Sequence, residues 1–182
     1  MNVLTDAYYI EKIQAGETEC FAILLDRYSR PVFSLIVKIA GSREDAEELT
    51  QDVFLKVFRS LSSFQGNSLF STWLYRIAYN VAVSATRKKQ YEWLTVEESM
   101  IENVPENEIS DEVEQWEKEE QLCRLEKALE QLLPDERALV SLFYMQEKQI
   151  DEIVSITGLS VSNVKTKLHR IRKKMLFLMQ KI

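Results

Sequence analysis

Apolar residues recur at helical spacing along nearly the whole chain of 182 residues. They return every three or four positions, which places them on one stripe of a helix, and no segment of useful length alternates with the two-residue period of a strand. Only 4 Gly and 3 Pro interrupt the pattern. The sequence therefore predicts an all-α fold. We expect helices over residues 4–14, 18–40, 43–61, 71–89, 116–133, 137–145, 149–157 and 161–175.

The last two of these helices are separated by one short turn. Gly158 suits the left-handed backbone conformation that ends a helix, and Ser160 can accept hydrogen bonds from the free amides that open the next one. Two helices joined by a tight glycine turn are typical of a helix-turn-helix DNA-binding unit. The apolar stripe of the second helix is Val164, Leu168, Ile171 and Met175.

The opposite face of residues 161–175 carries the side chains that such a unit needs. Short hydroxyl and amide groups near the helix start can read base edges, and the lysine and arginine groups toward its end can hold phosphates. The alternative is an ordinary solvated helix with a cationic C-terminal end, which the helix dipole favours. The candidate DNA-binding residues are Ser162, Asn163, Thr166, Lys167, Arg170 and Lys173.

Residues 43–61 form a helix with two different faces. One face carries only apolar residues and is expected to point toward a core: Ala46, Val53, Val57 and Leu61. The other joins acidic side chains to a leucine, which suits docking on a basic, partly apolar partner surface. A solvated face with one stray leucine is the alternative. This outward face consists of Glu44, Glu48, Gln51, Asp52, Leu55 and Arg59.

The helix over 71–89 and the loop before it combine aromatic and cationic residues. Unpaired bases stack on aromatic rings while arginine and lysine follow the phosphate backbone, so this combination suits single-stranded DNA. The polar loop of Gln65, Gly66, Asn67 and Ser68 can accept a base turned out of the duplex. The alternative is that the Trp and Tyr of this helix belong to the core. The candidate residues on the helix are Trp73, Arg76, Tyr79, Asn80, Arg87 and Lys88.

Charge divides the chain into three parts. The net charge is +1 over residues 1–90, −13 over 91–136 and +6 over 137–182, so the total of −6 hides a cationic C-terminal segment. Residues 91–115 are rich in Glu and have no steady apolar period, as in a linker. The expected domains are an N-terminal helical domain (1–90), an acidic linker (91–115) and a C-terminal helix-turn-helix domain (116–182). The sequence leaves open whether the two domains touch, although the opposite charges of the acidic segment (−13) and the C-terminal segment (+6) favour a closed form.

The remaining composition argues against several classes of protein. No run of about 18 apolar residues exists to insert into a membrane, and the N-terminal residues lack the pattern of a secretory signal. Cys20 and Cys123 stand far apart, form no metal or redox spacing, and fit a reducing cytosol. With one His, no phosphate-binding glycine loop and no nucleophile elbow, we expect no enzymatic activity, no metal and no cofactor.

Three segments in series resemble bacterial sigma factors. Residues 45–58 (DAEELTQDVFLKVF) are similar to the helix by which these proteins dock on RNA polymerase. Residues 64–66 (FQG), followed by 71–80 (STWLYRIAYN), resemble their strand-opening element, which reads the −10 DNA. Residues 132–137 (LLPDER) and the helix-turn-helix resemble their −35 reading domain. The order, the spacing and the absence of an extra domain resemble the small extracytoplasmic-function group.

This resemblance implies a role for each candidate residue. Glu48, Gln51, Asp52 and Phe58, with Leu55 on the same face, would grip core RNA polymerase. The loop Gln65 to Ser68 would capture an extruded −10 base, and Trp73, Arg76, Tyr79 and Asn80 would lie on the melting helix. Tyr79 departs from the family pattern, in which a basic residue is frequent, and so implies stacking at that position. Ser162, Asn163, Thr166, Lys167 and Arg170 would lie on the −35 recognition helix, and the acidic linker would thread a basic channel of the polymerase.

The sequence therefore predicts a cytoplasmic bacterial sigma factor that directs core RNA polymerase to a two-part promoter. Its expected partners are core RNA polymerase, promoter DNA and an inhibitory anti-sigma protein, without membrane insertion. The alternative function is a stand-alone helix-turn-helix regulator whose N-terminal domain senses a signal or dimerises. That alternative explains the C-terminal helices but gives the aromatic and cationic helix over 71–89 no role.

Overall fold

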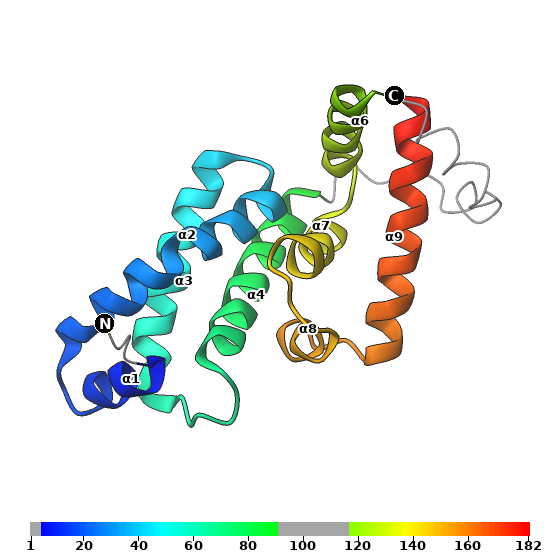
Figure 1. The fold of residues 1–182 in the computed structure, drawn as a ribbon. Coiled ribbons are helices and arrows are strands. Elements are labelled where there is room, and N and C mark those ends of the chain that lie inside the picture. The colour runs from blue at the N-terminus through cyan, green and yellow to red at the C-terminus, as the bar shows by residue number, and fades with distance from the viewer. Residues whose placement is uncertain (1–4, 91–116) are drawn as a thin grey trace.

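The computed structural model describes residues 5–90 and 117–182, with the side chains of 88–90 outside the description. Every regular element in these two ranges is a helix, which confirms the predicted all-α fold (Figure 1). The predicted acidic linker, residues 91–115, lies outside the described residues, so the limits of the three predicted segments stay a prediction. None of the described helices is long and apolar enough to cross a membrane.

The N-terminal group of helices is built around α2 (Phe21–Ala40), which packs on α3 (Arg43–Ser60) and on α4 (Phe70–Gln90). The short α1 (Asp6–Gln14) lies against the start of α2. Gly41 ends α2 in the left-handed conformation, with φ of +73°, and the Ser42 side chain caps α3 by accepting from the backbone N–H of Asp45. The resulting sharp corner holds α2 and α3 side by side.

The C-terminal group contains α6 (Lys118–Glu130), α7 (Pro134–Val140), α8 (Ile150–Thr157) and α9 (Val161–Lys181). Gly158 and Ser160 end one helix and cap the next, as predicted for the turn of the helix-turn-helix. Gly158 ends α8 with φ of +76°, and Ser160 caps α9 by accepting from the N–H of Asn163 at 3.2 Å. The stripe of Val164, Leu168 and Ile171 is buried, and Met175 is half-buried.

Several predicted helix boundaries were wrong: α2 begins at Phe21, α6 ends at Glu130, and α9 continues to Lys181. The fourth helix begins at Phe70, before the hydroxyl residues expected to cap it, because Phe70 packs into the core and draws the first turn with it. The helix expected over 137–145 begins earlier, at Pro134, since proline is favoured in the first turn of a helix. That helix passes directly into one π-helical turn, Ser141–Met145. Beyond it Glu147 has a positive φ of 51°.

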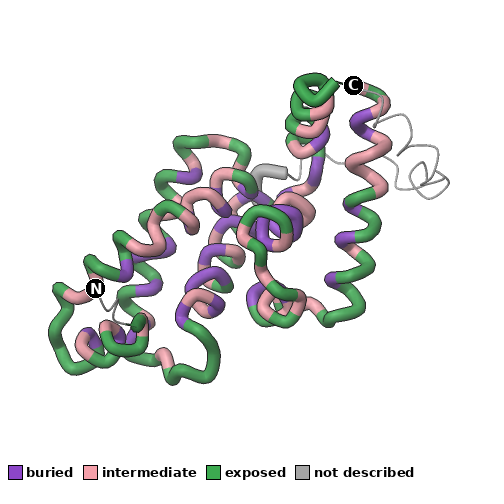
Figure 2. Tube along the Cα trace, viewed as in Figure 1, coloured by how far each residue is buried: buried purple, intermediate pink, exposed green. Residues whose placement is uncertain are grey.

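The two groups of helices pack against each other along one helix, α4. Its inner side contacts α2 and α3, and another side contacts α7 and α8, while α7 also touches α2. Figure 2 shows buried residues gathered along the facing sides of these helices, and they form one continuous apolar cluster. The question that the sequence left open is therefore answered: the two groups are in contact.

Two leucines with different surroundings test this description of the core. Leu35 of α2 is fully buried, whereas Leu55 of α3 is 53% exposed. Replacement of Leu35 by Ala should lower the free energy of unfolding by about 2–5 kcal/mol because it leaves a cavity. The matched Leu55→Ala change should cost less than about 0.5 kcal/mol. Urea denaturation followed by circular dichroism measures both, and equal effects would contradict the description.

Candidate nucleic-acid and protein interfaces

The outward face of α3 collects all five residues that were expected to bind polymerase. Glu48, Gln51, Asp52, Leu55 and Phe58 are exposed. At about 100° per residue they fall within a sector of about 120° of the helix surface. The structure thus brings them together as one acidic face with an apolar part, and we call these five residues the α3 face.

The apolar part of the α3 face packs on an aromatic residue of α2. Phe58 is 42% exposed, and its ring meets that of Phe21 from α2 edge-on with a centroid distance of 5.0 Å. Phe21 also contacts the buried Phe54. Because the Phe58 ring is held by these contacts, a partner can bury it at a low cost in side-chain entropy.

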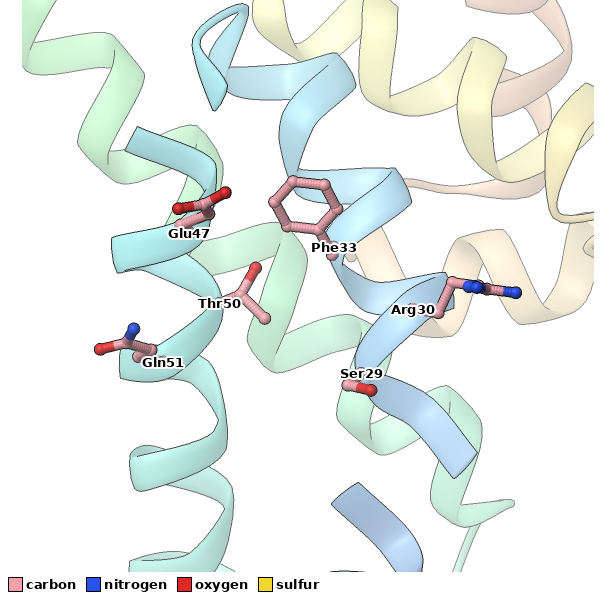
Figure 3. A pocket seen from close by; sticks show the side chains of 6 residues that line it. All are labelled: Ser29, Arg30, Phe33, Glu47, Thr50 and Gln51. Atoms are coloured by element: carbon pink, nitrogen blue, oxygen red, sulfur yellow. The ribbon is translucent and has the colours of Figure 1, made fainter. Parts of the chain in front are cut away.

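A shallow groove beside the α3 face was not predicted. It lies between α2 and α3 and is lined by Phe33 of α2 and by Glu47, Thr50 and Gln51 of α3 (Figure 3). Gln51 belongs to both the groove and the α3 face. The periodicity of a single helix does not reveal this groove, because residues of two helices line it. Ser29 and Arg30 of α2 complete the lining.

The loop before α4 presents a polar tip on an aromatic base. Gln65, Gly66, Asn67 and Ser68 are all exposed, and Gly66 has φ of +72°, a conformation that favours glycine. The base is a cluster of three rings, Phe64, Phe70 and Trp73, with centroid distances of 5.1 to 5.9 Å. The Gln14 amide also donates to the carbonyl oxygen of Phe64 at 3.0 Å. The tip is therefore free to contact a ligand while its two ends are fixed.

The candidate residues on α4 differ in exposure. Arg76, Asn80 and Arg87 are exposed, whereas Trp73 and Tyr79 are half-buried. Each of these two rings packs on the core and stays partly accessible, and the DNA-binding role of both stays a prediction. Burial raises the pKa of Tyr79, and the negative charge of Asp135 raises it further. The Lys88 side chain lies outside the described residues.

The outward face of α9 contains the six candidate residues of the helix-turn-helix. Ser162, Asn163, Thr166 and Arg170 are exposed, and Lys173 is half-buried. Lys167 differs, because its ammonium group forms an ion pair with the carboxylate of Asp135 on α7 at 3.0 Å. The six residues cover about 140° of the helix surface. One side of α9 thus offers hydroxyl, amide and cationic groups together.

The two groups of helices meet through polar contacts as well as apolar ones. The Tyr75 hydroxyl of α4 donates to Oε1 of Gln146 at 2.6 Å, and the Lys148 ammonium lies 5.1 Å from the centroid of the Tyr75 ring. Tyr75 is buried, and this burial, followed by the charge of Glu152, raises its pKa to about 12. Tyr75 is therefore a neutral hydrogen-bond donor at physiological pH.

Within residues 5–90 and 117–182, no group of three or more His, Cys, Asp or Glu side chains is placed to hold a metal ion. The fold and the exposed faces instead define a helical protein of the helix-turn-helix class, with further exposed polar surfaces outside that unit.

Comparison with known families identifies this class further. Residues 24–91 match Sigma-70 region 2, and residues 124–175 match Sigma-70, region 4. The chain is 31% identical to the ECF RNA polymerase sigma factor SigW of Bacillus subtilis (strain 168), over 90% of this chain and 91% of the relative. It is also 31% identical to the ECF RNA polymerase sigma-E factor of Escherichia coli (strain K12), over 93% and 92%. The chain therefore belongs to the ECF sigma factors of the sigma-70 family.

Two solved structures share this fold. CnrH, determined in complex with the cytosolic domain of CnrY, matches with a TM-score of 0.68 at 20% identity and covers 97% of both chains. The sigma factor RpoE of Bartonella quintana, determined with the anti-sigma factor NepR, matches with a TM-score of 0.64 at 20% identity. It covers 88% of this chain and 96% of that one. The arrangement of helices is thus shared with CnrH and with the sigma factor RpoE.

The raised pKa of Tyr75 predicts a loss of stability in alkali. The folded state favours the neutral phenol, so this contribution is complete below the ordinary pKa of 10 and is lost as pH rises toward about 12. The free energy of unfolding should fall over this range, and it should fall less steeply in Tyr75→Phe. Urea denaturation of both proteins at several pH values measures the difference. Parallel pH profiles would contradict the assignment.

Proposed function

We propose that this protein binds core RNA polymerase through the α3 face and directs it to promoters with α4 and α9. One observation supports the proposal most strongly: three sets of candidate residues, each exposed in large part, lie on three separate helices of one chain. A stand-alone regulator needs only the α9 surface. The proposed factor would catalyse no reaction itself and would act in the bacterial cytoplasm.

Docking on polymerase depends on both charge and apolar contact. Glu48 and Asp52 supply negative charge that attracts a basic surface, and Leu55 and Phe58 supply apolar area to bury. Such a combination of buried apolar centre and complementary charge is typical of specific protein interfaces. The neighbouring groove at Phe33 would extend the contact onto α2.

Reversal of two charges on the α3 face tests this docking. The double change Glu48→Lys and Asp52→Lys should weaken core polymerase binding by about a hundredfold or more, because each lysine would face a basic partner. The matched control is Glu119→Lys with Glu126→Lys, which makes the same change in charge on exposed sites of α6. Surface plasmon resonance on immobilised core enzyme gives the affinities. Unchanged binding by the α3 variant, with its helical content intact, would refute the proposed docking surface.

DNA recognition would be divided between α9 and α4. On α9, Ser162, Asn163 and Thr166 lie near the helix start, where side chains reach base edges in the major groove. Arg170 and Lys173 follow and would hold phosphates. On α4, Arg76 and Asn80 would contact an unpaired −10 strand, and the loop tip at 65–68 would receive one flipped base.

Single arginine substitutions separate the two DNA-binding surfaces. Arg170→Ala should weaken −35 duplex binding by about tenfold and reduce the salt slope of log K by about 1, because one phosphate contact is lost. Arg76→Ala should weaken binding of the −10 single strand and leave the duplex unaffected. Fluorescence anisotropy of holoenzyme on promoter fragments found by start-site mapping measures both, with Lys127→Ala on α6 as the control. Equal effects on both DNA elements would contradict the division.

Three further features follow from the same proposal. The domain limits 1–90, 91–115 and 116–182 would separate −10 recognition, the acidic linker and −35 recognition. The linker carboxylates would thread a basic channel of the polymerase. The solved structures with an anti-sigma factor and with a cytosolic partner domain support a similar inhibitory protein partner for this chain.

A further inference from the structure

The short helix α1 lies outside the part of the chain, residues 24–91, that matches Sigma-70 region 2. It is nevertheless fixed to the N-terminal group of helices, because Ile10 and Ile13 are buried in the core. The helix packs on α2 and on the 3₁₀-helical turn Leu61–Ser63, which joins the end of α3 to the loop before α4 (Figure 1). Helix α1 is therefore in contact with the base of the loop that is proposed to capture a DNA base.

The last residue of α1 holds the first end of this loop. The Gln14 amide donates one hydrogen bond to the carbonyl oxygen of Leu61 and one to that of Phe64, each at 3.0 Å. The backbone N–H of Phe64 also donates to the Leu61 oxygen, at 3.1 Å. Nitrogen of a carboxamide carries two hydrogens, so Gln14 can serve the carbonyl groups at both ends of one turn. It thus fixes the direction in which the chain leaves Phe64 and enters the polar tip, residues 65–68.

The first residue of α1 supports the second end of the loop. The Asp6 carboxylate accepts a hydrogen bond from the Tyr28 hydroxyl and pairs with the Arg27 guanidinium, both on α2. Burial raises the pKa of Tyr28, and the hydrogen bond to Asp6 raises it further, so the hydroxyl stays a donor. The Tyr28 ring meets that of Phe70 edge-on, with a centroid distance of 5.5 Å. The two ends of α1 therefore support the loop on either side of its tip, one at Phe64 and the other, through Tyr28, at Phe70.

The orientation of the loop tip depends on these two ends. Residues 65–68 are exposed, and the hydrogen bond from the Asn67 amide to Oε1 of Gln65, at 3.3 Å, lies within the tip and does not tie it to the helices. A site whose hydrogen-bonding groups are fixed rejects a wrong base, because these groups are then left unpaired. A loose site rearranges around the wrong base and loses this selectivity. Selection of one base by the tip therefore requires that the ends of the loop are held.

We propose that Gln14 is a positioning residue for −10 recognition, which holds the loop so that its tip distinguishes one base from the others. This inference rests on the proposed function, because it takes residues 65–68 as the site of base capture. Gln14 contacts no base itself and acts through the carbonyl groups of Leu61 and Phe64. Without its two donors, only a fraction of the molecules hold the loop in the binding-competent arrangement.

Two substitutions at Gln14 separate the hydrogen bonds from the bulk of the side chain. Gln14→Met keeps a similar length and removes both donors, whereas Gln14→Lys restores N–H donors on a slightly longer side chain. Because Gln14 is exposed, neither change disturbs the core. The matched control is Gln131→Met, at the exposed glutamine that follows α6. Circular dichroism checks the fold of each variant.

Hydrogen exchange of the full-length protein, followed by mass spectrometry, tests the loop without DNA. Backbone amides within residues 61–70 should exchange about fivefold faster in Gln14→Met than in the wild type, because the loop opens more often. Gln14→Lys should return to within about twofold of the wild-type rate, and Gln131→Met should not change it. Equal exchange of residues 61–70 in Gln14→Met and the wild type would overturn the positioning role and leave the proposed function untouched.

Holoenzyme binding tests the consequence for DNA recognition. The probes are promoter fragments found by start-site mapping, in which each −10 position is replaced in turn by the other bases, and fluorescence anisotropy gives the affinities. At one −10 position, the affinity ratio between the best base and the others should fall about fivefold in Gln14→Met. Gln14→Lys should restore that ratio to within about twofold, since the added charge acts on all bases alike and cancels. Ratios at the other −10 positions should not change.

A purely structural role for Gln14 gives a different pattern of results. A uniform loss of affinity at every −10 position, or a loss of selectivity that Gln14→Lys does not restore, would overturn the positioning role while promoter recognition stands. If the wild-type holoenzyme distinguishes no base at any −10 position, the proposed −10 recognition fails, and this inference fails with it.

Discussion

The packing of α4 between two groups of helices is the constraint on which the rest of this structure depends. One side of α4 completes the core with α2 and α3, and another side meets α7 and α8. Only the remaining strip is exposed, and it carries Arg76, Asn80 and Arg87. A single helix thus shares its surface among a core, an interdomain contact and a candidate DNA strand. Any change in one of these contacts alters the surface left for the others.

The parts of the molecule that could be predicted from sequence are those stabilised by contacts within one helix or one turn. The helices, the turn at Gly158 and the cap at Ser160 depend on local patterns, because their stabilising contacts lie within a few residues. The α3 face was also predictable, since its five residues lie on one exposed side of one helix. Periodicity alone was sufficient for the helices and for four residues of the α3 face, whereas Phe58 was expected there only from the family resemblance.

The parts that sequence could not predict join residues far apart in the chain. Periodicity places Tyr75 on α4 but cannot identify Gln146 as its partner, 71 positions away. It places Lys167 on the outward face of α9 but does not reveal that Asp135 holds it. The predicted start of α4 was wrong because it also depends on tertiary contacts. The packing of the Phe70 ring in the core outweighed the capping preference of the hydroxyl residues that follow it.

The π-helical turn at Ser141–Met145 has a consequence for how the two groups of helices meet. A π turn holds one more residue than an α turn, and so it shifts the helical register of all that follows. Removal of that residue would rotate Gln146 by about 100° around the axis and move it by about 1.5 Å along it, away from the Tyr75 hydroxyl. The length of the chain at this turn, independently of its side chains, therefore sets whether α4 and the helix-turn-helix fit together.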